Sequence, residues 1–300
     1  MNIKNALLIC GRNFVLIWKQ MVYTLILVAL VGLCLWGTLT PIFDMLSSAG
    51  WFEELLSYLE LVYKEPANVA AGFEGIMTKL WVLFVNNAPV LWGNYIVSIL
   101  LIALVPSFAL SLSYYTAGDL VNAKLCSSVN YGWIHRFLSS LKSSVPFALI
   151  NTLIKIPFMA LGVGALMLYG ALANTFLKAT LFLPLLIIVL LAIFSLKFTL
   201  SMWFLPDYLT NGKGLFKSLK NNFKLVGRHF SRLALGAFLL YLVEFASIML
   251  LTVFTLGAGL ILIIPALPVV NVAYSLISYY QENSMRYYID ANTIVSPVQD

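Results

Sequence analysis

Charged side chains are scarce in this sequence. Only 18 lysines and arginines and 12 aspartates and glutamates occur among 300 residues, whereas 61% of the residues are hydrophobic. Soluble domains carry about 25% charged residues, so a composition with 10% charged residues excludes an ordinary water-soluble globule. The mean hydropathy of +0.94 indicates an integral membrane protein instead.

Cysteine and histidine are scarce as well. Cys10, Cys34 and Cys126 have no paired spacing, so we expect neither a disulfide framework nor a zinc site. His135 and His229 do not match any metal-ligand spacing. The sequence contains no phosphate-binding glycine loop, no paired membrane aspartates and no recognisable nucleophile with its base. We therefore expect no catalytic residues, no metal, no cofactor and no enzymatic activity.

Long uncharged runs occur instead. A helix needs about 20 apolar residues to cross ~30 Å of hydrocarbon. The run from Phe245 to Gln281 is long enough for two crossings, with Gly257 and Gly259 predicting a turn between them. The fold class predicted is all-α, a polytopic membrane protein with six transmembrane helices in one integral membrane domain over residues 1–300. The spans are expected near residues 20–42, 89–116, 145–170, 178–205, 233–256 and 259–281.

Most basic residues lie in segments that share one side of the predicted membrane. They are Lys4, Arg12, Lys19, Lys124, Arg136, Lys142, the six cations of residues 213–232, and Arg286. The longest segment on the opposite side, residues 44–88, contains six acidic residues. Cations near span ends mark the cytoplasmic side, so both termini are predicted to be cytoplasmic.

The stretch KGLFKSLKNNFKLVGRHFSR, residues 213–232, concentrates positive charge. Its cations recur every three or four residues and are Lys213, Lys217, Lys220, Lys224, Arg228 and Arg232. On one helix they would occupy an arc of about 120°, with phenylalanines on another arc. This pattern predicts an amphipathic interfacial helix whose cations contact the anionic headgroups of membrane lipids. A purely topological role is the alternative, and nucleic acid is not expected because the aromatic residues do not lie among the cations.

Short internal similarities suggest a repeat. RNFVLIWK (12–19) aligns with NNFKLVGR (221–228), and SSLKSS (139–144) resembles KSLKNN (217–222). The chain could therefore contain three units, each an interfacial helix followed by a transmembrane hairpin. These units would cover residues 1–116, 117–205 and 206–282. Chance similarity under a common physical constraint is the alternative.

Residues 44–88 form an insertion in the first unit. Aromatic and aliphatic residues from Trp51 to Leu61 alternate with glutamates, and Pro66 ends the pattern. A second helix is expected over 73–86. We expect these amphipathic helices to lie outside the membrane and to cap or shield an external opening, with an ordinary surface loop as the alternative.

Ionisable residues within predicted spans are the main candidates for function, because charge in hydrocarbon is costly. Lys155 and Glu244 lie at matching depths and could form a buried ion pair, with Asn151 one turn from Lys155. The alternatives are that they belong to a path for a substrate or ion, or that they face lipid because the span limits are misplaced. Lys197 lies nearer the cytoplasmic end of its span and is expected to extend toward headgroups.

The plan of an interfacial helix plus a hairpin resembles a known family. In WFLPDYLTNGKGLFKSLKNNFKLV (203–226), a span ends at a proline and a short turn leads into a basic helix. This resembles the membrane domain of bacterial glycerophosphoryl diester phosphodiesterases and related uncharacterised six-helix bacterial membrane proteins. The resemblance covers nearly the whole chain and implies a bacterial inner-membrane location. It does not imply hydrolysis, since that activity resides in a separate soluble domain in the family.

Three functional hypotheses follow from these patterns. The first is a non-enzymatic membrane protein that transports or accommodates a lipid or another amphipathic small molecule. The second is a structural or accessory subunit that packs on another membrane protein. An intramembrane enzyme is third, because the residues for catalysis are missing. A cavity that opens to lipid or water and reaches Glu244 would favour the first, and a filled bundle with a broad flat apolar face would favour the second.

Overall fold

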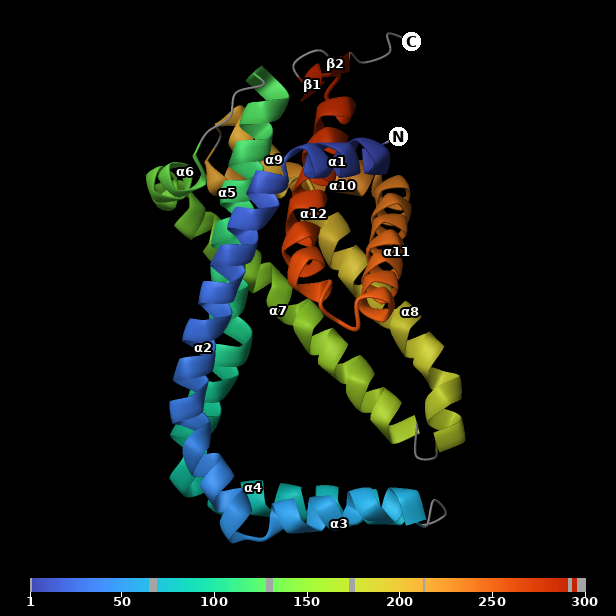
Figure 1. Ribbon diagram of the computed structural model, residues 1–300. Coiled ribbons are helices and arrows are strands. Elements are labelled where there is room, and N and C mark those ends of the chain that lie inside the picture. The colour runs from blue at the N-terminus through green and yellow to red at the C-terminus, as the bar shows by residue number, and fades with distance from the viewer. Residues whose placement is uncertain are drawn as a thin grey trace. The chain divides into compact units, whose positions relative to one another are not determined.

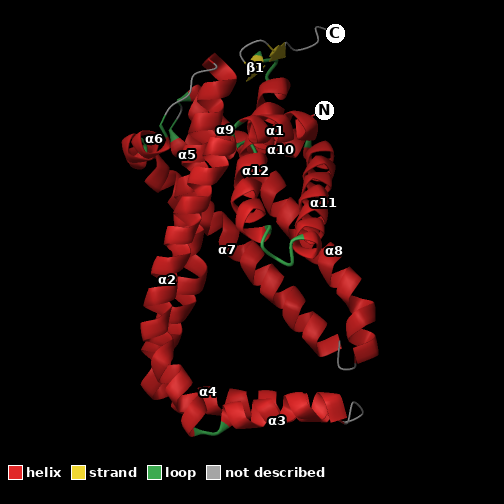
Figure 2. Ribbon diagram, viewed as in Figure 1, coloured by secondary structure: helices red, strands yellow, loops and turns green. Residues whose placement is uncertain are grey.

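The computed structural model describes residues 2–64, 69–127, 132–172, 176–212, 214–290 and 293–295. Helices make up nearly all of them (Figures 1 and 2), so the predicted all-α polytopic fold is confirmed. The elements in chain order are α1 (Asn2–Arg12), α2 (Phe14–Ser48), α3 (Trp51–Lys64), α4 (Val69–Ile99), the π-helical turn η2 (Leu100–Leu104), α5 (Val105–Ser127), α6 (Trp133–Ser139), α7 (Leu141–Leu172), α8 (Phe176–Ser201), α9 (Phe204–Asn211), α10 (Leu215–Arg228), α11 (Phe230–Phe254), α12 (Leu260–Glu282), β1 (Tyr287–Asp290) and β2 (Thr293–Val295).

Six helical stretches of the described chain are long and apolar enough to cross a membrane. They are Phe14–Ser48, Glu74–Ser127, Leu141–Leu172, Leu181–Asn211, Phe230–Phe254 and Leu260–Glu282. The predicted number of spans is therefore confirmed, but several helices are longer than expected. The turn between the last two helices is confirmed as well, and Gly257 adopts a φ of 91°, which glycine tolerates best.

The second span shows the largest difference from its expected limits. The helix does not begin near residue 89 but at Val69, and it continues through η2 into α5. Pro106 lies two residues after the end of η2 and has no N–H to donate to the carbonyl one turn earlier. The wider π-helical turn accommodates the chain beside this proline without ending the helix.

The chain divides into two compact units. Unit 1 comprises Met1–Ile26, Ser107–Leu166 and Leu185–Asp300, and unit 2 comprises Leu27–Pro106 and Met167–Pro184. This division differs from the three predicted repeats. A short helix does precede a pair of long helices three times along the chain, at α1, α6 and α10. Because the matched stretch 12–19 includes the α1–α2 junction whereas 221–228 lies within α10, the repeat stays a prediction.

Unit 2 contains the segment that was expected as an external insertion. The predicted amphipathic helix is present as α3, but the second helix, expected over 73–86, is the first part of the continuous helix α4. Figure 1 shows α3 beside this part of α4. The Trp51 Nε1 donates to the Ile76 carbonyl at 3.4 Å, and Lys79 pairs with Glu54. The external location and the capping role of these helices stay predictions.

Unit 1 is organised around α12. In the most hydrophobic stretch of α12, 61% of the residues are buried, against 17% or less in the other five candidate spans. Helix α1 packs against α12, where Asn5 Nδ2 donates to the Tyr287 hydroxyl at 3.1 Å. Tyr287 begins a small antiparallel hairpin, β1–β2, that the sequence analysis did not predict. The segments 2–12 and 287–290 therefore meet on one side of unit 1, as an even number of spans requires.

Polar contacts stabilise the corner between α8, α9 and α10, which falls in the stretch that carries the family resemblance. The backbone turns at Trp203, whose N–H donates to Asn222 Oδ1 at 3.0 Å, while Asn222 Nδ2 donates to the Leu200 carbonyl at 2.7 Å. Asp207 Oδ1 accepts three hydrogen bonds, from Asn211 Nδ2, Asn221 Nδ2 and the Tyr279 hydroxyl. Asp207 is fully buried, so it holds three helices together in a region without bulk water.

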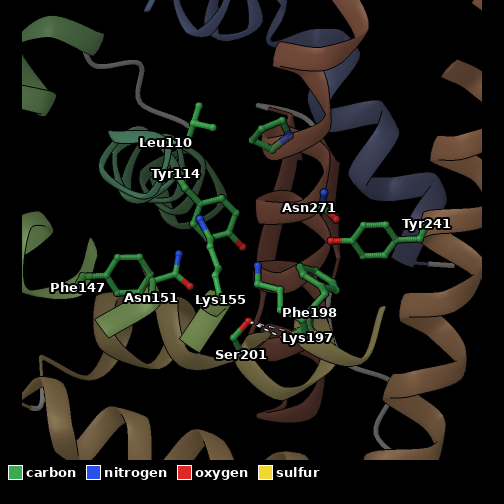
Figure 3. Close-up of a pocket in the computed structure, with 11 residues that line it drawn as sticks. Leu110, Tyr114, Phe147, Asn151, Lys155, Lys197, Phe198, Ser201, Tyr241 and Asn271 are labelled. Atoms are coloured by element: carbon green, nitrogen blue, oxygen red, sulfur yellow. Dashed lines mark hydrogen bonds between the residues drawn. The ribbon is translucent and has the colours of Figure 1, made fainter. Parts of the chain in front are cut away.

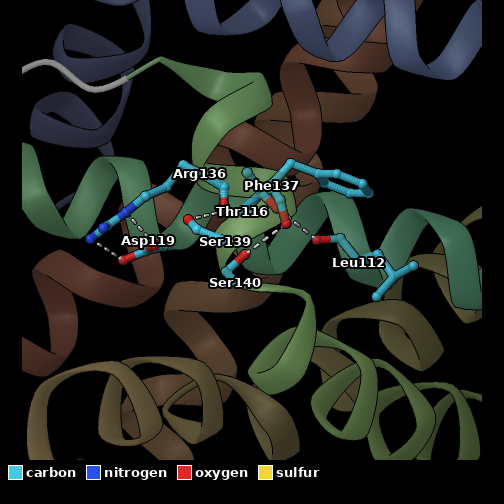
Figure 4. Close-up of polar contacts among 7 residues, drawn as sticks. All are labelled: Leu112, Thr116, Asp119, Arg136, Phe137, Ser139 and Ser140. Atoms are coloured by element: carbon cyan, nitrogen blue, oxygen red, sulfur yellow. Dashed lines mark hydrogen bonds and ion pairs between the residues drawn. The ribbon is translucent and has the colours of Figure 1, made fainter.

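A second polar contact fixes α6 against α5. Arg136 forms a two-pronged ion pair with Asp119, with Nε 2.7 Å from Oδ2 and Nη2 3.2 Å from Oδ1 (Figure 4). The Ser139 and Ser140 hydroxyls donate to carbonyls of the same short helix, Arg136 and Phe137. These bonds satisfy backbone groups at a helix end, where carbonyls lack partners within the helix.

Replacing Asp207 with asparagine tests the role of this carboxylate. The Asp207→Asn protein is expected to lose about 2 kcal/mol of stability, because three charge-assisted hydrogen bonds become neutral or are lost. The measurement is the thermal unfolding midpoint of the purified protein in detergent. Asp44→Asn, at an exposed aspartate of α2, is the control and should leave the midpoint unchanged. Equal midpoints for the two variants would contradict the role assigned to Asp207.

Candidate functional site

Unit 1 contains a cavity of about 190 Å³ between its helices. Side chains from α5, α7, α8, α11 and α12 line it (Figure 3). The polar lining residues are Tyr114, Asn151, Lys155, Lys197, Ser201, Tyr241 and Asn271. Figure 3 shows both lysine side chains reaching into the cavity and the two tyrosine hydroxyls turned toward it. Hydrogen-bond donors and positive charge thus dominate the polar surface of the cavity.

Helical spacing brings these residues together. On α7, Phe147, Asn151 and Lys155 follow one another at intervals of four, so they lie on one face of the helix. Lys197 and Ser201 have the same interval on α8. The apolar lining residues Leu110 and Phe198 belong to the neighbouring helix faces that pack around the polar groups.

Lys155 is held by a hydrogen-bond network between α5 and α7. Its Nζ donates to Ser111 Oγ at 2.7 Å and lies 3.4 Å from the Ser107 carbonyl. Ser111 also accepts from Asn151 Nδ2 at 3.0 Å and donates to the Ser107 carbonyl at 2.7 Å. Asn151 and Ser111 are buried, so this network fixes the position of the ammonium group without neutralising it.

Lys197 has a different environment. It was expected to extend toward headgroups, but it lines the interior cavity together with Lys155. Its Nζ forms no hydrogen bond within the described residues, and no ion pair in that part of the chain involves either lysine. Lys197 is half-buried, and Figure 3 shows its side chain directed into the cavity.

The predicted ion pair between Lys155 and Glu244 is not formed. Lys155 faces α5, whereas Glu244 on α11 lies beside the side chain of Asn271 on α12. The two residues have matching depths along their helices, but the rotation of each helix about its axis directs them to different neighbours. Glu244 is only 6% exposed, and its Oε1 is buried without a hydrogen-bond partner among the described residues.

The cationic stretch forms a helix over Leu215–Arg228, as expected, but the helix does not include all six cations. Lys213 lies outside the described residues. Arg232 lies on α11, beyond a break in the helix at His229, and it pairs with Glu282. His229 Nε2 is 2.9 Å from the other oxygen of Glu282. The expected single face of six cations is therefore wrong at Arg232.

Helix α10 presents three sectors. Ser218, Asn222 and Val226 form the buried sector. Two exposed sectors follow around the helix, one with Phe216 and Phe223 and one with the cations Lys217, Lys220, Lys224 and Arg228. At about 100° per residue the cations and phenylalanines together cover an arc of roughly 140°. This arrangement suits a helix that lies at a membrane surface with rings directed inward and cations at headgroup level.

Comparison with family models, curated proteins and solved structures finds no match to this chain. The resemblance to the membrane domain of glycerophosphoryl diester phosphodiesterases therefore stays a prediction. The structure does give the quoted stretch a local role, because residues 203–226 form the corner at Trp203, Asp207 and Asn222.

Sequence reasoning identified Lys155, Lys197 and Asn151 but not the residues that complete the cavity. Ser111, which holds Lys155 in place, was missed. The sequence does contain a signal for it, because Ser107 and Ser111 are four residues apart, as Asn151 and Lys155 are. Tyr114, Tyr241 and Asn271 carry no comparable signal. They line the cavity only because α5, α11 and α12 are neighbours in the fold, which the sequence does not show.

Replacing Lys197 with methionine tests whether its charge serves stability. We expect the Lys197→Met protein, stripped of lipid, to be at least as stable as wild type, and up to about 1–4 kcal/mol more stable, because an unpaired ammonium group is removed. Lys155→Met should instead lower the thermal midpoint, because Ser111 Oγ and the Ser107 carbonyl each lose one of their hydrogen bonds. Lys142→Met, at an exposed lysine, is the control. Equal destabilisation by Lys197→Met and Lys155→Met would mean that Lys197 is structural.

Proposed function

We propose that this protein is a non-enzymatic membrane protein that accommodates a lipid with a phosphate or carboxylate headgroup. The observation that carries the proposal is the pair of lysines in one cavity, without a carboxylate ion-paired to either in the described chain. Two like charges repel strongly away from water, so the empty cavity is electrostatically unfavourable. An anionic headgroup would relieve that repulsion and accept hydrogen bonds from both ammonium groups.

The size of the cavity supports a headgroup rather than a whole molecule as the enclosed part. Pockets that enclose a complete drug-sized ligand measure about 300–1,000 Å³, and this cavity measures about 190 Å³. The acyl chains of the lipid would then remain among the apolar side chains or in the surrounding bilayer. The criterion stated for the sequence is met only in part, because unit 1 has a cavity among its spans but Asn271, and not Glu244 itself, lines it.

The exposed sectors of α10 extend the proposal to the membrane surface. We place α10 at the cytoplasmic face of a bacterial inner membrane, in line with the distribution of basic residues. Its four described cations would then meet anionic headgroups, each contributing about 1 kcal/mol at low salt. Anionic lipids would gather next to unit 1, where the Lys155–Lys197 cavity provides a stronger site for one of them.

Loss of both cavity lysines tests the central claim. Lys155→Gln/Lys197→Gln is expected to bind an anionic lipid at least about tenfold more weakly, because a hydrogen bond to a charged group contributes about 1.5–3 kcal/mol. Native mass spectrometry would count phosphatidylglycerol retained after delipidation, with phosphatidylcholine as the neutral comparison. Lys4→Gln/Lys142→Gln removes two exposed lysines and matches the change in net charge. Retention at the wild-type level in the cavity variant would refute the proposal.

A separate variant tests the α10 surface. Lys217→Gln/Lys220→Gln/Lys224→Gln should weaken the general enrichment of anionic lipid around the protein, by about 3 kcal/mol in total at low salt. The readout is energy transfer from tryptophan to a labelled phosphatidylglycerol, in nanodiscs with and without added salt. The variant with arginine at the same three positions keeps the charge and should behave as wild type. If the glutamine variant keeps both the enrichment and its salt dependence, the α10 proposal fails while the cavity proposal stands.

A further inference from the structure

Next to the lysine cavity lies a second buried polar spot that the proposed function does not use. Glu244 is only 6% exposed, and the side chain of Asn271 lies beside its carboxyl group. Glu244 Oε1 and Asn271 Oδ1 are both buried, and neither has a hydrogen-bond partner within the described residues. While Glu244 is ionised, both atoms can only accept hydrogen bonds, so the two cannot satisfy each other without a proton or a cation between them.

Titratable groups surround this spot on several helices. Tyr114 of α5, Tyr241 of α11 and Cys10 of α1 lie within electrostatic range of the Glu244 carboxyl. Burial and, to a smaller extent, the charge of Glu244 raise the pKa of Cys10 to about 11, so the thiol is neutral at physiological pH. None of these three neighbours is cationic, and the lysines of the adjoining cavity form no ion pair with Glu244. The carboxylate therefore has no direct counter-charge among the residues that the structure describes.

We propose that Glu244 and Asn271 hold a monovalent cation, either a proton or a sodium ion. A buried carboxylate without a counter-charge is costly even with a hydrogen bond from the Asn271 side chain, and a cation that accepts electron pairs from Glu244 Oε1 and Asn271 Oδ1 would reduce that cost. Oxygen atoms are the ligands that hard cations prefer. A divalent ion is disfavoured because Lys155 and Lys197 already place two positive charges nearby.

Asn271 connects this site to the cavity, since it lines the cavity and also flanks Glu244. With all three groups ionised and no ligand bound, the charges of the two lysines and Glu244 sum to +1. A headgroup anion lowers that charge, and it thereby makes a cation at Glu244 more favourable. By thermodynamic linkage the cation must favour the anion to the same extent. This coupling rests on the proposed function, whereas cation binding itself can be measured alone.

The experiment follows the thermal midpoint of the purified full chain, both delipidated and with phosphatidylglycerol. One arm titrates sodium chloride against choline chloride at fixed pH and ionic strength, and the other varies pH in choline chloride alone. If the site binds sodium, the thermal midpoint should rise by about 3 °C or more when sodium replaces choline. If the site binds a proton, the thermal midpoint should rise only when the pH is lowered. Histidine side chains titrate in the same pH range, so the second arm is read as the difference between wild type and Glu244→Gln.

Glu244→Gln should abolish either response, because its amide supplies a donor of its own and carries no charge. If this variant does not fold, wild type provides a second measurement, the rate at which a hydrophobic carbodiimide modifies Glu244. Sodium should slow that reaction at a sodium site, and a rise in pH should slow it at a proton site. No response to either cation, with and without lipid, would overturn the proposal. A response that is unaffected by the lipid would retain the cation site and reject its coupling to the anion.

Discussion

Mutual repulsion between two ammonium groups, away from bulk water, is the interaction on which the polar interior of unit 1 depends. Lys155 and Lys197 line one cavity, and each raises the electrostatic cost of the other because little water screens them. Ser111, Asn151 and the Ser107 carbonyl orient Lys155 but add no negative charge. A counter-ion from outside the chain would stabilise the pair, and the proposed anionic ligand rests on this requirement.

The number of spans was predictable from the sequence, and the lengths of some helices were not. Uncharged runs in the sequence indicate which segments can lie in hydrocarbon, so they locate the six candidate spans. They do not report where a helix ends. Glu74 and Lys79 interrupt the apolar run and suggested a separate helix, yet helical hydrogen bonding continues past them in α4. The β1–β2 hairpin was missed because strands of four and three residues are too short for a clear alternating pattern.

The candidate site was predictable in part for a related reason. Sequence spacing gives the depth of a side chain along a helix and the residues that share its face, which is why Asn151 and Lys155 were recognised together. It does not give the rotation of that face relative to other helices. Lys155 and Glu244 therefore seemed to be partners, whereas the partner across the cavity is a second lysine and Glu244 is directed toward Asn271. Arg232 illustrates the same limit, because a break at His229 moves it onto another helix.

The contact between α1 and α12 has a consequence for how the protein is made. Helix α1 belongs to the first dozen residues, and its main partners are α12 and β1, more than 250 residues later in the chain. During synthesis on the ribosome α1 emerges long before these partners exist. Until then the apolar face of α1 needs another apolar surrounding, and the membrane surface can supply one. The core of unit 1 is thus completed only after α12 and β1 have been synthesised, and chains that stop before them would leave α1 without its native neighbours.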